Sequence, residues 1–147
     1  ITVRASLIGP ERDENGIGLL NWFLKQRDAI QGYANAIWTG LSTLEFARQI
    51  EALLSVHASG LFQFAPDYAI SKFELLAKFN QVFCAGSKAI ERFENQKVDK
   101  SLLPEFKGFR LSIPSYDDMI REMAEWVSTH AELYPEYYTK GLYHDQA

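Results

Sequence analysis

A tyrosine and a lysine stand four residues apart in the segment Tyr68-Ala69-Ile70-Ser71-Lys72. On one helical face this spacing places the ammonium beside the phenol, where its charge lowers the phenol pKa and makes the pair an acid–base catalyst for carbonyl reduction. Ser71, however, is predicted to cap the helix that follows, so Tyr68 would lie before that helix. The two side chains would then not share a face. We therefore predict no catalytic role for this pair, and no catalytic residue elsewhere in the chain.

The other groups that could do chemistry lack the partners that their chemistry requires. Gly16 and Gly18 are a close glycine pair, but no strand precedes them and the G-x-G-x-x-G phosphate-binding pattern is absent from the sequence. Ser6 has no nearby His or Asp that would make it a nucleophile. The three histidines lack metal-ligand spacing. Asp117 and Asp118 stand in the first turn of a predicted helix, where carboxylates favour the helix dipole. The sequence therefore predicts no metal site.

Three helices that would position a site begin with the same signal. Each starts at a serine whose hydroxyl can accept a hydrogen bond from a free backbone N–H, and each has an acidic residue three positions further on. These serines are Ser42, Ser71 and Ser115. Apolar residues at helical spacing follow each serine, and residues 16–27 carry a similar apolar stripe. The sequence predicts four to five helices in all.

Extended segments alternate with these helices. The chain opens with a strand-like run over residues 2–7, which Gly9-Pro10 closes as a turn. Residues 29–38 form two short extended pieces broken near Asn35, and residues 60–65 alternate like a strand. Weaker strand candidates are 89–93 and 109–113. Strands that alternate with helices predict βα units, so the predicted fold class is α/β, a few strands packed with helices.

Composition and charge exclude several classes of function. The chain has 147 residues, 47% of them hydrophobic, which suffices for one sizeable core. The 15 basic and 19 acidic residues are interspersed and give a net charge of −4, which argues against a nucleic-acid surface. The apolar runs are too short to span a membrane. A single cysteine, Cys84, excludes an internal disulfide, indicates a reducing compartment, and is predicted to be a buried small hydrophobe.

Six segments, in this order, carry a family resemblance. They are Val3-Arg4-Ala5-Ser6-Leu7-Ile8-Gly9, Gly18-Leu19-Leu20-Asn21-Trp22-Phe23-Leu24, residues 36–47, residues 60–64 with 70–76, Val98-Asp99-Lys100-Ser101-Leu102, and Pro114-Ser115 with the helix that follows. Together they resemble the carboxyl-terminal part of dTDP-4-dehydrorhamnose reductase-like proteins, members of the extended short-chain dehydrogenase/reductase and NAD-dependent epimerase/dehydratase superfamily. The chain departs from the usual pattern at Trp38, where proline is common, and at Lys100, where arginine is common.

The resemblance implies the carboxyl-terminal portion of an NAD(P)-binding Rossmann-like fold. It also implies NAD(P)H-dependent reduction of a 4-keto nucleotide sugar, or a related epimerase reaction. We expect this chain to be the substrate-binding part of such a reductase, inactive alone, with NAD(P)H bound by the intact protein and not held tightly here. The alternative is a non-catalytic regulatory or binding module on the same fold. The sequence leaves open the sugar, the nucleotide base, and NADH against NADPH.

By position, the resemblance assigns two groups of site residues. The cofactor-facing group is Ser6, Leu7 and Ile8, and the substrate-facing group is Asn35, Trp38, Thr39 and Lys100. Lysine can meet a phosphate as a point charge, although it lacks the bidentate fork of arginine. Two alternatives stay open: core packing accounts for Trp38 equally well, and a solvated surface charge is the favoured account of Lys100.

The chain is expected to divide into a substrate-binding part, residues 1–134, and a partly ordered tail, residues 135–147. Because the opening strand has no sheet neighbours upstream, we expect a piece of a larger enzyme in which this strand is an exposed edge. Exposed edges pair with other chains, so a homo-oligomer through the first strand is a candidate assembly. The expected partner is a nucleotide-sugar substrate, with neither nucleic acid nor membrane, and the expected location is the cytoplasm.

Overall fold

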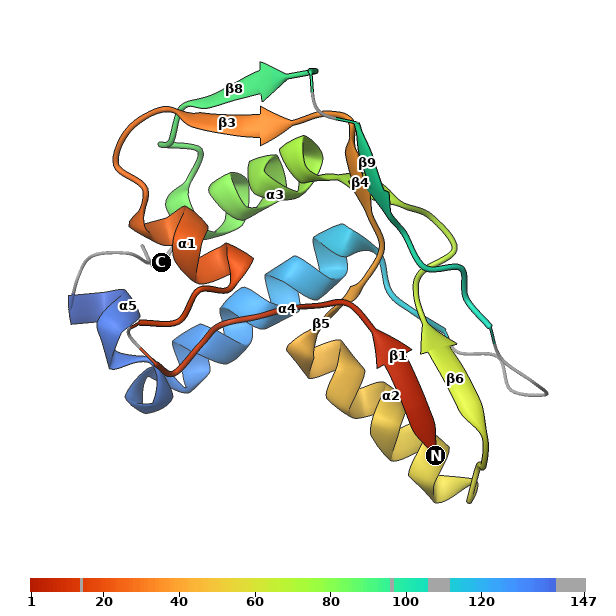
Figure 1. Cartoon of the computed structure of the whole chain (residues 1–147). Helices are drawn as coiled ribbons and strands as arrows, with labels where there is room; N and C mark the ends of the chain where they lie inside the picture. The colour runs from red at the N-terminus through yellow and green to blue at the C-terminus, as the bar shows by residue number, and fades with distance from the viewer. Residues whose placement is uncertain (14, 96, 106–111, 140–147) are drawn as a thin grey trace.

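The computed structural model describes residues 1–13, 15–95, 97–105 and 112–139. Over these residues, nine short strands alternate with five α-helices, which confirms the predicted α/β class (Figure 1). The strands pair into four small sheets of two or three strands each. No helix in the described ranges is long and apolar enough to cross a membrane.

The opening strand lies at a sheet edge. β1 (Thr2–Ala5) pairs in parallel with β6 (Leu61–Phe64), and β2 (Leu7–Ile8) pairs in parallel with β5 (Leu41–Ser42). β6 is the one strand hydrogen-bonded to β1 within the described part of the chain, so the other side of β1 is an open edge, as the sequence predicts. Figure 1 shows β1 and β6 side by side, with the amino terminus at the start of β1.

Two further sheets hold the segment that the sequence assigns to the substrate. β3 (Ile30–Tyr33) pairs in parallel with β8 (Ile90–Phe93). β4 (Ala36–Trp38) pairs antiparallel with β7 (Ile70–Ser71) on one side and parallel with β9 (Val98–Lys100) on the other. The break between β3 and β4 confirms the two extended pieces predicted for 29–38. Of the strand candidate 109–113, residues 109–111 lie outside the described residues.

Three helices begin where the serine caps predict. They are α2 (Thr43–Ser55), α3 (Lys72–Cys84) and α4 (Tyr116–Thr129). In each, the hydroxyl of the preceding serine accepts a hydrogen bond of 3.1 Å from the backbone N–H three residues on. The cap of α3 is reciprocal, because the Glu74 carboxylate accepts from the backbone N–H and the hydroxyl of Ser71. These bonds hold the pKa of Glu74 below its usual range, so this carboxylate is ionised at neutral pH.

The first helix is shorter than predicted. α1 covers Leu19–Lys25, whereas the apolar stripe predicted residues 16–27. At its start, the N–H of Gly18 donates to the Glu11 carboxylate at 2.7 Å, which holds the preceding residues in a loop. At its end, the Lys88 ammonium donates to the Leu24 carbonyl at 3.1 Å and covers the last turn. Contacts from outside the helix therefore set both of its ends.

The core lies where α1, α3 and α4 meet the inner faces of the strands. The rings of Phe23 from α1 and Phe79 from α3 are fully buried, with centroids 5.9 Å apart. Phe64 of β6 and Met119 of α4 are also fully buried. Cys84 is 3% exposed at the end of α3, and burial raises the pKa of its thiol, which confirms the predicted apolar role.

The carboxyl-terminal segment packs against the beginning of the chain. A 3₁₀ turn (Ala131–Leu133) leads to α5 (Pro135–Thr139). The Tyr137 hydroxyl is buried; it accepts from the Glu11 N–H at 3.0 Å and donates to the Asn21 side-chain carbonyl. Burial raises the pKa of Tyr137 to about 12, so the phenol stays protonated and can donate. The tail predicted from residue 135 therefore begins as a packed helix, and residues 140–147 lie outside the described residues.

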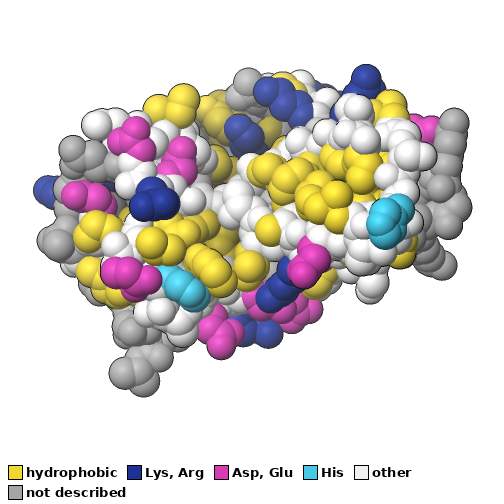
Figure 2. Space-filling view, turned by 90° about the horizontal axis from the view of Figure 1, so that it is seen from below, with side chains coloured by type: hydrophobic (Ala, Val, Ile, Leu, Met, Phe, Trp, Pro, Cys, Tyr) yellow, Lys and Arg dark blue, Asp and Glu magenta, His cyan; other side chains and the backbone are white. Residues whose placement is uncertain are grey.

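The outer surface mixes charges of both signs. Figure 2 shows acidic and basic side chains side by side on the face seen from below, between separate patches of hydrophobic side chains. This pattern agrees with the interspersed charges in the sequence. On this face the basic side chains do not form the continuous stripe that marks nucleic-acid binding.

Candidate functional site

The pairing of β4 with two strands brings Trp38 and Lys100 together. Trp38 ends β4, and its register partners are Ile70 on β7 and Lys100 on β9. Trp38 and Lys100 both line a cavity of about 310 Å³, which we call the Trp38 cavity. Its lining residues are Tyr33, Ala36, Ile37, Trp38, Lys72, Val98 and Lys100. Two residues predicted from the sequence as substrate contacts thus share one site.

The Trp38 cavity combines aromatic surface with positive charge. Tyr33 and Trp38 supply the rings, and the charged side chains that line the cavity are the two lysines, Lys72 and Lys100. Ammonium groups act as point charges for phosphate, and aromatic faces accept planar rings by stacking. The cavity can therefore bind an anion that carries an apolar or planar group. Its volume is at the lower end of the range for small-molecule sites, about 300–1,000 Å³.

Packing from behind fixes the Trp38 ring. Its centroid lies 6.0 Å from that of Tyr116, the first residue of α4. The Tyr116 hydroxyl accepts a hydrogen bond from the Gly40 N–H at 3.3 Å, and burial raises the pKa of this phenol to about 12. A Cβ on Gly40 would overlap both the Trp38 ring and the Ser6 carbonyl oxygen. Trp38 therefore packs against Tyr116 and also lines the cavity, and its contact with a substrate stays a prediction.

Asn35 and Thr39 use their side chains for structure. The Asn35 amide donates to the Glu94 carbonyl at 2.6 Å, and Asn35 lines a separate shallow hollow. Thr39 is buried; its hydroxyl donates to the Leu102 carbonyl at 3.0 Å and accepts from the Leu102 N–H at 2.6 Å. Thr39 thus fastens the segment that follows Lys100 to the end of β4. The structure places neither residue in the Trp38 cavity.

The predicted cofactor-facing residues offer little surface to a ligand. The Ser6 carbonyl accepts from the Leu41 N–H at 3.0 Å, and Ile8 is a core residue. Leu7 is 45% exposed, and of the three residues it is the one whose apolar side chain could contact a ligand. Ser6, Leu7 and Ile8 by themselves therefore do not make a dinucleotide phosphate site, and their role beside a cofactor stays a prediction.

Tyr68 and Lys72 line different cavities. Tyr68 lies in the loop before β7, where its hydroxyl accepts from the Tyr116 N–H at 3.0 Å. Lys72 is the first residue of α3 and faces the Trp38 cavity, whereas Tyr68 lines a second cavity between α3 and α4. Desolvation by burial raises the pKa of Tyr68, the opposite of what an acid–base catalyst needs. Tyr68 and Lys72 thus do not share a helical face, as the sequence predicts, and the absence of a catalytic role stays a prediction.

Lys72 is the site residue that sequence reasoning missed. It follows the capping serine, and its place in the cavity depends on the antiparallel pairing of Ser71 with Ile37. No local pattern signals that pairing.

Among the described residues, no group of three or more His, Cys, Asp or Glu side chains lies close enough together to hold a metal ion.

No protein-family model matches the chain, and no curated protein does. Solved structures do match. The dTDP-4-dehydrorhamnose reductase of Bacillus anthracis in complex with NADP matches with a TM-score of 0.64 and 19% identity, over 82% of this chain and 46% of that one. The UDP-N-acetylglucosamine 4-epimerase of Methanobrevibacter ruminantium in complex with UDP-N-acetylmuramic acid matches with a TM-score of 0.62 and 15% identity, over 86% and 45%.

A GDP-L-fucose synthetase of Naegleria fowleri bound to NADP matches with a TM-score of 0.62 and 14% identity, over 87% of this chain and 44% of that one. The chain thus spans less than half the length of these structures. Likeness at such identities establishes the fold, and the fold is that of part of a Rossmann-like extended short-chain dehydrogenase/reductase. The fold predicted from the sequence resemblance is confirmed.

We predict that Gly40→Ala displaces the Trp38 ring. The added methyl group meets ring and backbone atoms, so the variant should lose about 1–3 kcal/mol of unfolding free energy, as overpacked sites do. Denaturant unfolding and the tryptophan emission maximum would measure both effects. In Gly40→Ala combined with Trp38→Leu, the loss should be smaller than the sum of the two single losses. Strict additivity would show that the ring is not what opposes the methyl group.

Proposed function

We propose that the chain is the substrate-binding part of an NAD(P)-dependent nucleotide-sugar reductase of the dTDP-4-dehydrorhamnose reductase type, inactive as an isolated chain. The observation that carries the proposal is the Trp38 cavity, where Lys72 and Lys100 flank the rings of Trp38 and Tyr33. A nucleotide sugar has the matching chemistry, a diphosphate joined to a planar base. The two lysines would meet the diphosphate, and the rings would stack on the base.

The proposed roles divide between this chain and the part of the fold that it does not span. Residues 1–134 would form the substrate lobe, with α5 packed against it through Tyr137. The part of the fold that this chain does not span would hold NAD(P)H, which supplies the hydride. Leu7, exposed at the end of the first strand, would give an apolar contact at that boundary, with the Ser6 hydroxyl beside it. A cytoplasmic enzyme would suit the single buried cysteine.

A second candidate is a non-catalytic binding or regulatory module on the same fold. One observation favours it: Tyr68 and Lys72 face different cavities. Such a module would keep the Trp38 cavity and bind the same class of anion. The two candidates differ in one respect. In the reductase, a hydride donor would lie beside the Trp38 cavity, and in the module it would not.

We predict that dTDP- and UDP-sugars bind the Trp38 cavity weakly. A partial site makes few contacts, so the dissociation constant should be on the order of millimolar, about −4 kcal/mol. Titration followed by tryptophan fluorescence and by NMR shifts around Trp38 would measure it. Lys100→Ala and Lys72→Ala should each weaken binding about three- to tenfold, since each removes a charged partner of the diphosphate.

Lys97→Ala is the matched control, because Lys97 is an exposed lysine beside β9 that does not line the cavity. It removes the same charge and should change affinity less than twofold if the contacts are local. Trp38→Ala should weaken binding as the lysine variants do. Titrations that perturb no residue around Trp38 would leave its ring as core packing and reject the substrate-lobe proposal.

The isolated chain should show no turnover with NADPH and a dTDP-4-keto sugar. Its sequence has no G-x-G-x-x-G pattern for the cofactor phosphates, and positioning the hydride donor is most of what the protein gives to such a reaction. Loss of NADPH absorbance is the measurement. Tyr68→Phe should only lose about 1 kcal/mol of stability, because the Tyr116 N–H loses its acceptor. Turnover that disappears in Tyr68→Phe would contradict the non-catalytic role.

The open edge of β1 is the proposed contact for self-association. Unpaired N–H and C=O groups along an edge strand are templates for a further strand, and Ile1 and Leu61 add exposed apolar surface beside it. Sedimentation velocity at rising protein concentration should show a dimer. A single monomeric species at high concentration, with slow amide exchange along residues 2–5, would contradict it.

A further inference from the structure

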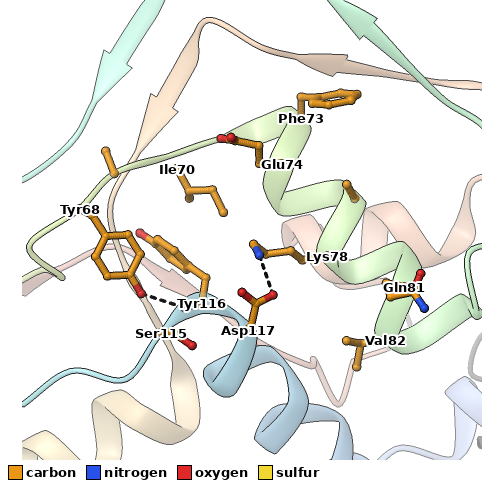
Figure 3. A pocket seen from close by; sticks show the side chains of 12 residues that line it. Tyr68, Ile70, Phe73, Glu74, Lys78, Gln81, Val82, Ser115, Tyr116 and Asp117 are labelled. Atoms are coloured by element: carbon orange, nitrogen blue, oxygen red, sulfur yellow. Dashed lines mark hydrogen bonds and ion pairs between the residues drawn. The ribbon is translucent and has the colours of Figure 1, made fainter.

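A second, more voluminous cavity lies away from the Trp38 cavity. It has a volume of about 630 Å³ and is bounded by the exposed side of α3, the first turn of α4 and the loop before β7 (Figure 3). We call it the α3–α4 cavity. It shares no lining residue with the Trp38 cavity. Its size falls within the range of small-molecule sites.

Three aromatic rings stand among the residues that line the α3–α4 cavity: Tyr68, Phe73 and Tyr116. Tyr68 stands at 90° to Tyr116, with the centroids 5.3 Å apart. The hydrogen bond from the Tyr116 N–H to the Tyr68 hydroxyl, at 3.0 Å, fixes this pair. Ile70 and Val82 add aliphatic surface. This wall of the cavity is therefore already formed without a ligand.

The charged side chains that line the cavity sum to one negative charge, and the Arg92 guanidinium, which is not a lining group, lies 5.3 Å from the Phe73 ring centroid. Glu74 and Asp117 contribute −2 and Lys78 contributes +1, which gives −1. The Lys78 ammonium lies 2.6 Å from an Asp117 carboxylate oxygen, and Figure 3 shows the two side chains pointing toward one another. The Glu74 carboxylate accepts from Ser71 and is ionised, as described above.

We propose that the α3–α4 cavity binds a small organic ammonium ion that carries an apolar or aromatic body. The apolar body would lie against Ile70 and Val82, and the cationic end would lie among the rings and the carboxylates. Aromatic faces attract ammonium groups, and the attraction grows as the cation loses water. A ligand ammonium would compete with Lys78 for Asp117, so the ion pair is the group that the ligand displaces.

Three probes of equal size and different charge test the proposal: benzylamine, benzyl alcohol and benzoate. Each would be titrated into the full chain and followed by NMR shifts of the Ile70 methyl and the Tyr68 and Tyr116 rings. Benzylamine should bind tightest and benzoate weakest. Equal or tighter binding of benzoate, or no shift at these residues with benzylamine, would overturn the proposal.

Two variants should change benzylamine binding in opposite directions. Asp117→Asn removes a carboxylate and should weaken it about three- to tenfold, as loss of a charge-assisted hydrogen bond does. Lys78→Gln removes the competing ammonium and should tighten it by a similar factor. Benzyl alcohol, which has no charge, should change less than twofold in both. Parallel changes for benzylamine and benzyl alcohol would mean that charge does not select the ligand.

A cavity-filling variant locates the site. Ala77 is an exposed alanine of α3 that lines the cavity, so Ala77→Phe should fill it, keep the core intact, and abolish binding of benzylamine. Ala89→Phe makes the same change at an exposed alanine outside the cavity and should leave binding unaltered. Equal effects of the two variants would overturn the assignment. The nucleotide-sugar titration at the Trp38 cavity is a separate readout, so each proposal can fail without the other.

Discussion

The double pairing of β4 is the constraint on which the candidate site depends. β4 is the one described strand with neighbours on both sides, antiparallel β7 and parallel β9. One neighbour ends just before Lys72 and the other ends at Lys100, so both ammonium groups reach the same side of Trp38. Thr39 and Gly40 then tie the end of β4 to Leu102 and to Tyr116. A different pairing of β4 would break these hydrogen bonds and separate the two lysines from Trp38.

Local physics explains what the sequence could predict. A serine cap needs only its own hydroxyl and a backbone N–H three residues on, so Ser42, Ser71 and Ser115 revealed three helix starts correctly. The features that the sequence did not predict depend on contacts between residues far apart in the chain. The length of α1 depends on Glu11 and Lys88, and Lys72 enters the cavity through strand pairing. For the same reason the sequence could not show that the Thr39 hydroxyl is hydrogen-bonded to the backbone of Leu102.

Tyr116 separates two cavities of opposite character. On one side its ring supports Trp38 in a cavity whose charges are two lysines. On the other side it lines a cavity with an excess negative charge. Its hydroxyl and its backbone N–H are both used, for Gly40 and for Tyr68, so the residue cannot move without disturbing each wall. The fold thus presents two chemically distinct surfaces a single aromatic ring apart.

The bond network of Tyr137 has a consequence for the order in which the molecule can assemble. Glu11 and Asn21 are 126 and 116 residues from Tyr137, yet all three meet at one phenol oxygen. A ribosome makes Tyr137 long after the opening loop has emerged, so that loop must wait for α5 before it can reach its final hydrogen bonds. Contacts of such sequence separation slow folding. The beginning of this chain is therefore expected to complete its folding only after synthesis has passed α5.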